Sequence, residues 1–348
     1  MRSDSSAADQ ARLTPLRELS ARIGGNPLLT QASTGNTSIK LGNVLWIKAS
    51  GRWLADARHD DILVPLDLRE VKQHMRQRVD PSEIYAGASI ETAMHAVVPH
   101  PVVLHVHSVN TIAWAVRADA QLRLHRQLQG LRWQWVPYVP SGLPLAREIE
   151  RASCSGDSNV FVLGNHGLVI AGEDCDAVED LLSQVEQRLA ICPRKSGIAD
   201  YGALDEITER SSWDLPDDEG VHALATDPAS QAILSGGILF PCQSMFSNSI
   251  EAEVFRAISC PDAKELCESR YRARPFLMIE GRGVVVSRDM TRSQRAMMSG
   301  LAQVVQRINS SAPIHYLSDE EVESSVRIAS RYLGKAASDA VQMDTSAA

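Results

Sequence analysis

Residues 102–108 read VVLHVHS and come directly after Pro101. The β-branched residues predict a strand. Because side chains alternate along a strand, the aliphatic residues at 102, 104 and 106 would face a core, while His105 and His107 share the opposite face. The two imidazoles then lie about 7 Å apart along the strand, from which both can reach one metal ion. The alternative is a pair of histidines that cap the core or face solvent.

A third histidine follows the next apolar run. Residues 160–163 predict a buried strand, and the sequence GNHG (164–167) places His166 in a turn where glycines permit close backbone approach. Three histidines suit zinc with an open fourth position, which is the catalytic rather than the structural arrangement. The remaining histidines show no comparable grouping and are predicted to be surface or packing residues: His59, His74, His95, His100, His125, His222 and His315.

Glu91 opens a short predicted helix, residues 91–98, just before the histidine-bearing strand. A carboxylate near a zinc-bound substrate can move protons to or from carbon. The alternative interpretation is a negative charge that complements the dipole at the helix N-terminus. Spacing alone leaves both open.

Two loops flank a β-hairpin predicted from residues 37–40 and 44–48. They read TGNTS (34–38) and KASG (48–51). Small hydroxyl residues beside Gly or Asn expose backbone N–H groups that can cradle an anion such as phosphate, although both stretches are equally good turn sequences. Neither is a Walker P-loop, and Gly281-Arg282-Gly283 does not complete a dinucleotide fingerprint.

The rest of the chain predicts further α/β structure around a boundary after Pro193. Additional helices are expected over 14–24, 109–117, 145–152 and 177–191, with a strand over 168–171. Beyond a polar, acidic, aperiodic stretch, strands 276–280 and 283–287 precede helices 291–308 and 318–333, the last opened by a capping-box sequence, SDEE. The predicted division is a disordered N-terminus (1–13), a first domain (14–195), a linker (196–230), a small α/β domain (231–335) and a disordered tail (336–348).

Composition excludes several classes of protein. The 348 residues are 44% hydrophobic and 22% charged, which predicts a globular chain of about two domains. A formal charge of −8 disfavours nucleic acid and anionic lipid as partners. No apolar run reaches the ~18 residues of a membrane span. The six widely spaced cysteines read as reduced thiols and the N-terminus lacks a secretory signal, so a cytoplasmic protein is expected.

Five stretches, taken together and in order, resemble the class II aldolase/adducin family over roughly residues 14–192. They are TGNTS (34–38), LWIKASG (45–51), SIETAMH (89–95), VVLHVHS (102–108) and LGNHGLVIAGED (163–174). The sequences of these stretches are most similar to the aldolase portions of bacterial proteins that join a rhamnulose-1-phosphate aldolase to a short-chain dehydrogenase. Because no glycine-rich dehydrogenase motif follows, a stand-alone aldolase-like enzyme is expected.

The resemblance implies a three-layer α/β/α fold with a central, largely antiparallel sheet, plus a small C-terminal α/β domain. It implies that His105, His107 and His166 bind one Zn²⁺, or another divalent metal, and that Glu91 is the catalytic acid/base. Ile90 stands where fuculose- and ribulose-phosphate members carry a second serine. The residues implied to hold substrate or its phosphate are Gly35, Asn36, Ser50, Gly51 and Ser89.

The implied chemistry is reversible retro-aldol cleavage of a small sugar or sugar phosphate through a metal-stabilised enediolate. Related enzymes use the same residues for epimerisation, dehydration or decarboxylation of sugar-derived acids, and these stay open as alternatives. A non-catalytic adducin-like interaction protein is the further alternative, although adducin-like heads lack the metal histidines. The family also implies a homo-oligomer, commonly a tetramer with the site at a subunit junction.

Overall fold

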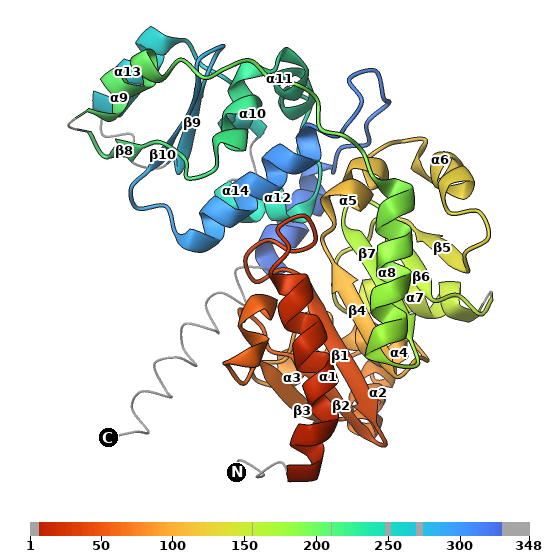
Figure 1. Cartoon of the computed structure of the whole chain (residues 1–348). Coiled ribbons are helices and arrows are strands. Elements are labelled where there is room, and N and C mark those ends of the chain that lie inside the picture. The colour runs from red at the N-terminus through yellow and green to blue at the C-terminus, as the bar shows by residue number, and fades with distance from the viewer. Residues whose placement is uncertain (1–6, 155, 210, 248–251, 269–273, 329–348) are drawn as a thin grey trace, which may run out of the picture.

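The computed structural model describes residues 7–154, 156–209, 211–247, 252–268 and 274–328. Across these residues no helix has the length and apolar character needed to cross a membrane. The chain forms a seven-stranded sheet and a three-stranded sheet, each with its own helices (Figure 1).

The larger sheet has the strand order β3-β2-β1-β4-β7-β6-β5. All neighbouring strands are antiparallel except β5 and β6, which are parallel. The predicted hairpin is confirmed as β1 and β2, and the histidine-bearing strand is β4. The strands are β1 (Asn36–Leu41), β2 (Val44–Lys48), β3 (Leu63–Asp67), β4 (Val102–Val106), β5 (Trp133–Val136), β6 (Val160–Leu163) and β7 (Gly167–Gly172).

Helices cover both faces of this sheet, which confirms the expected three-layer arrangement. One layer contains α1 (Ala7–Gly24), α6 (Ala120–Gln127) and α8 (Cys175–Leu189), and Figure 1 shows α1 and α8 side by side on the near face. The other layer contains α2 (Leu68–Arg76), α3 (Pro81–Ile84), α4 (Thr92–Val97) and α7 (Leu143–Cys154). Helix α5 (Val109–Ala115) follows β4, and the short helix η1 (Leu54–Arg58) packs on α1.

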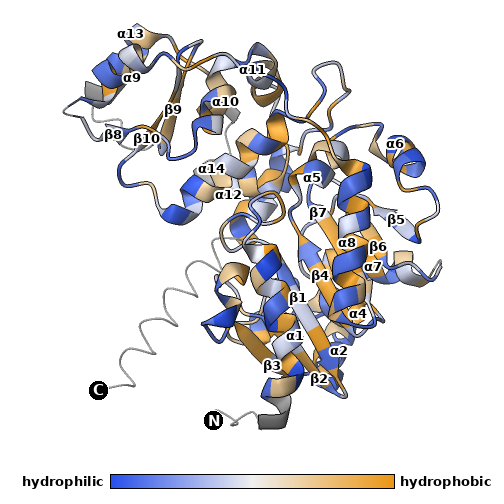
Figure 2. Cartoon of the chain, viewed as in Figure 1, coloured by the Kyte–Doolittle hydropathy of each residue, from blue (hydrophilic) through white to orange (hydrophobic). Residues whose placement is uncertain are grey.

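The predicted alternation along β4 is confirmed. Val102, Leu104 and Val106 join the hydrophobic cluster under α1 and α8. Val103 joins the cluster under α4 and α7, so the odd-numbered residues point to the opposite face. Figure 2 shows hydrophobic residues concentrated on β4, β6 and β7, as expected for strands buried on both faces. His105 therefore projects from the most buried part of the sheet.

Helix α1 begins earlier than the sequence analysis predicted. It starts at Ala7, so residues 7–13, expected to be disordered, are helical, and Pro15 lies inside the helix rather than in its first turn. The physical reason is that Leu13, Leu16 and Leu19 are all fully buried and recur at helical spacing. Residues 1–6 of the predicted disordered N-terminus lie outside the described residues.

The smaller sheet lies in the C-terminal part of the chain and has the order β8-β10-β9, all antiparallel. The helix predicted over 291–308 is α14, with the side chains of Thr291 and Gln294 forming a capping box. The elements are α9 (Tyr201–Thr208), β8 (Trp213–Asp214), η2 (Glu219–His222), α10 (Ala223–Thr226), α11 (Pro228–Ser235), α12 (Pro241–Ser247), η3 (Ala252–Phe255), α13 (Cys260–Glu268), β9 (Phe276–Ile279), β10 (Gly283–Ser287) and α14 (Arg292–Val305).

A further C-terminal helix spans residues 319–328. Its predicted capping box is present, because the Glu321 side chain accepts from the backbone N–H of Ser318 and the Ser318 hydroxyl accepts from that of Glu321. The end of this predicted helix, residues 329–333, and the predicted disordered tail, 336–348, lie outside the described residues.

The segment predicted as a linker, residues 196–230, is folded. It contains α9 and β8, and its apolar residues Leu204 and Trp213 are buried in a cluster with strands β9 and β10. Three of its nine acidic residues are helix N-caps: Asp200 caps α9, Asp218 caps η2 and Asp227 caps α11. The linker prediction from the polar composition was therefore wrong, because this segment forms short helices with acidic N-caps.

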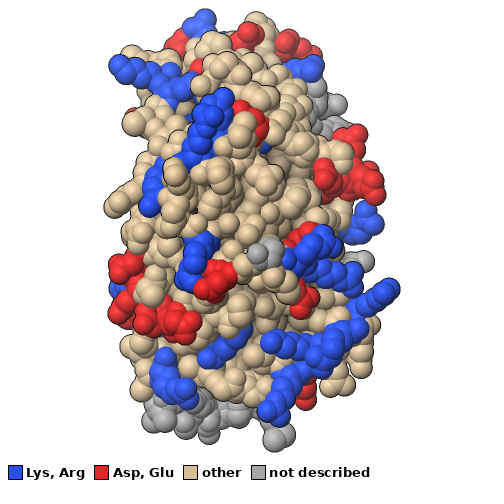
Figure 3. Space-filling view, turned by 90° about the vertical axis from the view of Figure 1, so that its right-hand side faces the viewer, with Lys and Arg blue, Asp and Glu red and all other residues tan. Residues whose placement is uncertain are grey.

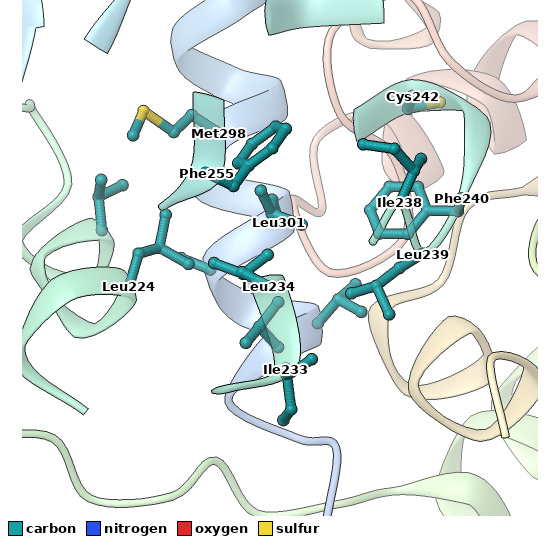
Figure 4. Close-up of a cluster of buried hydrophobic side chains, with 14 of the residues drawn as sticks. Leu224, Ile233, Leu234, Ile238, Leu239, Phe240, Cys242, Phe255, Met298 and Leu301 are labelled. Atoms are coloured by element: carbon teal, nitrogen blue, oxygen red, sulfur yellow. The ribbon is translucent and has the colours of Figure 1, made fainter. Parts of the chain in front are cut away.

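One hydrophobic cluster joins the two parts of the chain. It combines residues of α5, among them Ile112, with residues of α11, α12, β9, β10 and α14. Figure 4 shows Met298 and Leu301 of α14 in this cluster beside Leu234 and Phe255. The C-terminal part is thus packed against the helix that follows the histidine-bearing strand.

Charged residues of both signs occur in separate groups on the surface. On the face drawn in Figure 3, groups of Lys and Arg alternate with groups of Asp and Glu. Some of these charges connect elements: Arg22 of α1 pairs with Glu179 of α8 at 2.6 Å. Such exposed pairs each contribute little stability, so the hydrophobic clusters dominate the folding energy.

The shared cluster predicts a strong effect of truncating a leucine within it. Leu301 is 1% exposed, and we expect Leu301→Ala to lower the free energy of unfolding by about 2–5 kcal/mol through lost burial and a residual cavity. Leu122→Ala is the matched control, because Leu122 is 65% exposed. Urea unfolding measures both variants. An equal, small effect of the two substitutions would contradict the shared core.

Candidate metal centre

Three histidines meet at one end of the larger sheet. His105 lies within β4, His107 directly follows that strand, and His166 lies in the turn between β6 and β7. The pairing of Val106 with Leu168 brings the end of β4 and the turn before β7 to the same end of the sheet. The three residues each offer a ligand atom within 4.8 Å of the others, and all three are buried, at 0%, 7% and 6% exposure. The structure thus brings together the three residues that the sequence singled out.

The orientation of the rings suits a cation. His105 donates from Nδ1 to the backbone oxygen of Leu168 at 3.1 Å, which leaves the lone pair on its Nε2. That Nε2 lies 3.1 Å from the Nε2 of His107, whose Nδ1 faces the sulfur of Cys242 at 3.3 Å. For both Nε2 atoms to bind one cation, each ring must carry its proton on Nδ1, and each Nδ1 has a possible acceptor within reach. The donor set therefore fits a divalent metal, since three ring nitrogens can converge on one point while the second nitrogen of His105 and of His107 has a partner of its own.

Burial also keeps the imidazoles in the form that binds metal. Desolvation lowers the pKa of His105 to about 4 and holds the pKa of His107 well below its usual range. Both rings are therefore neutral at pH 7, and a neutral imidazole has the lone pair that a metal ligand requires.

Glu91 faces the same cluster. It is the N-cap residue of α4, but its side chain makes no capping hydrogen bond. Its two carboxylate oxygens instead lie 3.4 Å from His105 Nε2 and 3.3 Å from His166 Nε2. Burial opposes its ionisation, but the nearby imidazoles of His105 and His166 outweigh this and hold the pKa of Glu91 well below its usual value. The position of the side chain thus favours a role at the cluster over a role at the helix end.

The residues implied to hold phosphate fall into two groups. Asn36 and Ser89 are buried beside Glu91: the Asn36 amide donates to Glu91 at 2.7 Å and to the Ser89 hydroxyl at 3.2 Å. Gly35 adjoins them, and with φ +68 it leaves no room for a side chain, because a Cβ would lie 2.8 Å from the His105 backbone oxygen. Ser50 and Gly51 lie in the more exposed loop after β2.

That loop is nevertheless held close to the first group. The Ser50 N–H donates to Gly87 at 2.8 Å, and Ala49 forms an isolated bridge with Ala88, the neighbour of Ser89. Lys48 connects the loops further: its buried ammonium donates to the backbone oxygens of Ser33, at 2.7 Å, and Arg52, at 2.6 Å. The five residues implied to hold substrate or phosphate thus lie at the start of β1 or on loops beside it, and these segments are tied to one another.

A cavity leads away from the cluster. A small pocket beside His166 is lined by Ile90, Tyr138, Ser141 and Ile328. Three of these residues also line a larger cavity of about 480 Å³, together with Asp80, Ser82, Glu83, Pro140, Gly142, Pro144 and Ser324. Residues of the C-terminal helix line both spaces, and Ser325 hydrogen-bonds the Tyr138 hydroxyl at 2.8 Å. Both spaces are therefore lined by residues from the two parts of the chain.

The sequence profile of the Class II Aldolase and Adducin N-terminal domain matches residues 18–192, about half of the chain, and this span contains all three histidines and Glu91. The chain belongs to the class II aldolase/adducin family. A stretch of 174 residues is 28% identical to the uncharacterized oxidoreductase YuxG of Bacillus subtilis (strain 168), covering 43% of this chain and 25% of that protein. The chain thus spans about a quarter of the length of this curated relative.

Solved structures also match about half of the chain. The N-terminal class II aldolase domain of a conserved protein from Thermoplasma acidophilum is 23% identical with a TM-score of 0.43, over 54% of this chain and 94% of that one. L-fuculose-1-phosphate aldolase from Thermus thermophilus is 19% identical with a TM-score of 0.38, over 51% and 91%. An aldolase II superfamily protein from Pseudomonas syringae is 23% identical with a TM-score of 0.37, over 52% and 76%.

His95 supports Glu91, although the sequence analysis did not single it out as a site residue. It is fully buried, and its Nε2 donates to the Asn36 side-chain oxygen while its Nδ1 accepts from the Ser38 hydroxyl at 2.7 Å. Because the Asn36 amide in turn donates to Glu91, a chain of hydrogen bonds runs from Ser38 to the carboxylate. A signal was available: His95 lies four residues after Glu91, on the same side of α4.

Lys48 is a second residue that the sequence analysis did not single out. Burial lowers the pKa of its ammonium group to about 7, although the charge of Glu91 opposes this shift. Its two bonds to backbone oxygens keep the loops at residues 33–36 and 50–52 together. The sequence carried only a weak signal, a single charged residue in the apolar run LWIKA.

The burial of His95 predicts a pH-dependent stability. Burial lowers its pKa from 6.5 to about 3 in the folded protein. Below pH 6.5 the unfolded chain therefore binds a proton that the folded protein does not, so the free energy of unfolding falls as the pH is lowered. We expect His95→Gln to remove this contribution. Between pH 7 and pH 5 the free energy of unfolding of the variant should therefore fall by about 2 kcal/mol less than that of the parent.

Urea unfolding of the metal-free proteins at pH 7, 6 and 5 measures this difference in slope. The comparison uses slopes because the substitution also changes stability at pH 7. Equal pH dependence of the two proteins would show that folding does not lower the pKa of His95.

Proposed function

We propose that the protein is a metal-dependent lyase that cleaves a carbon–carbon bond of a small sugar or sugar phosphate in a retro-aldol reaction. The observation that carries this proposal is the meeting of three buried imidazoles with one buried carboxylate. Membership of the class II aldolase/adducin family supports it, and the three histidines and the glutamate lie within the matched residues. A purely adducin-like interaction protein would not require this buried donor set.

His105, His107 and His166 would hold the metal through ring nitrogens, which is a ligand set typical of catalytic zinc. We propose zinc, one ion per chain. When bound, the ion supplies a Lewis acid that stabilises negative charge on a substrate oxygen. The protein's part is to aim the three rings at one point, as the bond from His105 to Leu168 does.

Glu91 would carry the proton. Its low pKa makes it a carboxylate at pH 7, the form that accepts a proton in one direction of the reaction and returns it to a substrate carbon in the other. Asn36 donates to one of its oxygens at 2.7 Å, and Ser141 donates to the other at 3.4 Å. These bonds fix the carboxylate next to the imidazoles, where the reacting carbon of a substrate held by them would lie.

The cavity lining supports a hydroxylated substrate. Ser82, Ser141 and Ser324 contribute hydroxyl groups, Asp80 and Glu83 contribute carboxylates, and the described lining of the larger cavity contains no Lys or Arg. Neutral hydroxyl groups suit such a surface, whereas a phosphate would be repelled there. A phosphorylated substrate would therefore place its phosphate at the loops of Gly35 and Ser50, away from these carboxylates.

We also propose that this family member is related to the aldolase portions of bacterial rhamnulose-1-phosphate aldolase/dehydrogenase proteins. The match of 174 residues to a quarter of the oxidoreductase YuxG supports this relation. The homotetrameric assembly and the cytoplasmic location implied by the sequence stay predictions.

Metal analysis tests the ligand set directly. We expect the purified protein, loaded with zinc and dialysed, to retain about one zinc per chain. His105→Ala should retain only a small fraction of this, because two imidazoles bind zinc more weakly than three. His125→Ala is the control, since this histidine lies in α6, outside the cluster. Plasma emission spectrometry measures the content. Full zinc content in His105→Ala would overturn the assignment.

Glu91→Gln separates proton transfer from metal binding. We expect the zinc content to stay near that of the parent and turnover to fall by about 10²–10⁴-fold, because the amide cannot carry the proton. Cleavage of a panel of ketose 1-phosphates and aldonic acids, together with solvent-deuterium exchange at carbon, provides the assay. A variant that turns over at the parental rate would exclude Glu91 as the acid/base.

A further inference from the structure

The C-terminal part of the chain reaches the ligand His107 directly. Cys242 lies in α12 (Pro241–Ser247), and its sulfur is 3.3 Å from His107 Nδ1. The Nε2 of the same ring faces His105, so the sulfur lies on the side of the ring turned away from the cluster. This is the place where metal-binding histidines usually donate their second N–H to a carboxylate or backbone oxygen, as His105 does to Leu168.

The same part of the chain also clamps the turn that carries His166. The preceding residue, Asn165, has a left-handed backbone conformation with φ +50. Its side-chain amide donates to the backbone oxygens of Leu239, at 2.8 Å, and His315, at 2.7 Å. Its side-chain oxygen also faces His315 Nδ1 at 3.1 Å. All of these partners belong to the C-terminal part.

A third contact reaches the backbone beside the cluster. The Gln31 amide donates to the backbone oxygen of His107 at 3.3 Å. Gln31 packs so closely against α14 that a Cβ on Gly300 would lie 2.4 Å from its Cγ. Any larger residue at position 300 would therefore displace a side chain that holds His107.

The support itself is well anchored. Leu239, Phe240 and Cys242 belong to the hydrophobic cluster shared by both parts of the chain, and Figure 4 shows them together on the segment that leads into α12. The Leu239 N–H donates to the Gln243 side chain at 2.9 Å, which fixes the turn before the helix. Cys242 is thus held by packing on one side and faces His107 on the other.

We propose that Cys242 is a positioning residue for the metal ligand His107, and that Leu239, Cys242 and His315 make the C-terminal part a support of the metal centre rather than an independent module. The Nδ1–H of His107 donates to the Cys242 sulfur, and this bond fixes the tautomer and the direction of Nε2. The hydrogen bonds from Asn165 to Leu239 and His315 similarly fix the turn that carries His166. The inference rests on the proposed metal site and adds which residues hold its ligands in position.

Cys242→Ala in the full chain tests the proposal. Loss of a group that orients a metal ligand typically costs 10–100-fold in metal affinity, and we expect a loss in this range. Competition with a chromophoric chelator measures zinc affinity. Cys175→Ala is the matched control, because Cys175 is also a buried thiol but lies in α8, packed in the cluster under the sheet.

A second readout distinguishes positioning from packing. In the Co²⁺-loaded protein, each ligand histidine with a protonated Nδ1 gives a shifted, exchangeable proton resonance. We expect Cys242→Ala to move the resonance of His107 and speed its exchange, while the resonance of His105, bonded to Leu168, stays in place as an internal standard. Cys242→Ser keeps an acceptor at this position, so it should restore part of the affinity and of the protection from exchange.

The outcomes separate this inference from the proposed function. Parental zinc affinity and an unchanged His107 resonance in Cys242→Ala would overturn the positioning role while leaving the metal site intact. If Cys242→Ala fails to fold, Cys242→Val decides, because it fills the space of the thiol without an acceptor, and parental behaviour of that variant would likewise overturn the role. A parent protein that binds neither zinc nor cobalt would overturn the proposed function itself.

Discussion

The pairing of β4 with its two neighbours is the constraint on which the site depends. Asn36 of β1 lies opposite His105, and Leu168 of β7 lies opposite Val106. These registers bring the Asn36 amide to Glu91 and the turn of His166 to the other two histidines. Because side chains alternate along a strand, a slip of one residue in either pair would turn His105 into the opposite core. The hydrophobic alternation of β4 therefore fixes the chemistry as well as the fold.

Burying three imidazoles and a carboxylate is unfavourable unless each has a partner. The structure provides partners from separate places: a backbone oxygen of β7 for His105, the Cys242 thiol for His107, and Asn36 for Glu91. Burial raises the pKa of Cys242 to about 12, so its sulfur stays a neutral thiol. The ring nitrogens themselves lie close together, 3.1 Å apart for His105 and His107, which is a spacing from which they can share one cation. The packing that buries the three imidazoles is therefore also what aims them at one point.

The sequence predicted those features that depend on near neighbours along the chain. Alternation in VVLHVHS located the strand and the shared face of His105 and His107, and the turn GNHG located His166. Contacts between distant segments were not predictable: nothing near Cys242 indicates that it faces a residue 135 positions earlier. The same limit explains the linker prediction. An acidic residue such as Asp200 looks alike in a coil and at a helix N-cap, and the burial of Leu204 and Trp213, which distinguishes the two, depends on strands β9 and β10 far along the chain. Pro15, which is common in the first turn of helices, concealed the earlier start of α1.

The most direct measurement of the central claim is the position of a bound zinc ion in a crystal of the full chain, located by anomalous scattering on either side of the zinc absorption edge. The account predicts one strong peak per chain, about 2.0–2.1 Å from one nitrogen each of His105, His107 and His166. A peak at another site, or three rings turned away from one another in a zinc-loaded crystal without a peak between them, would contradict it.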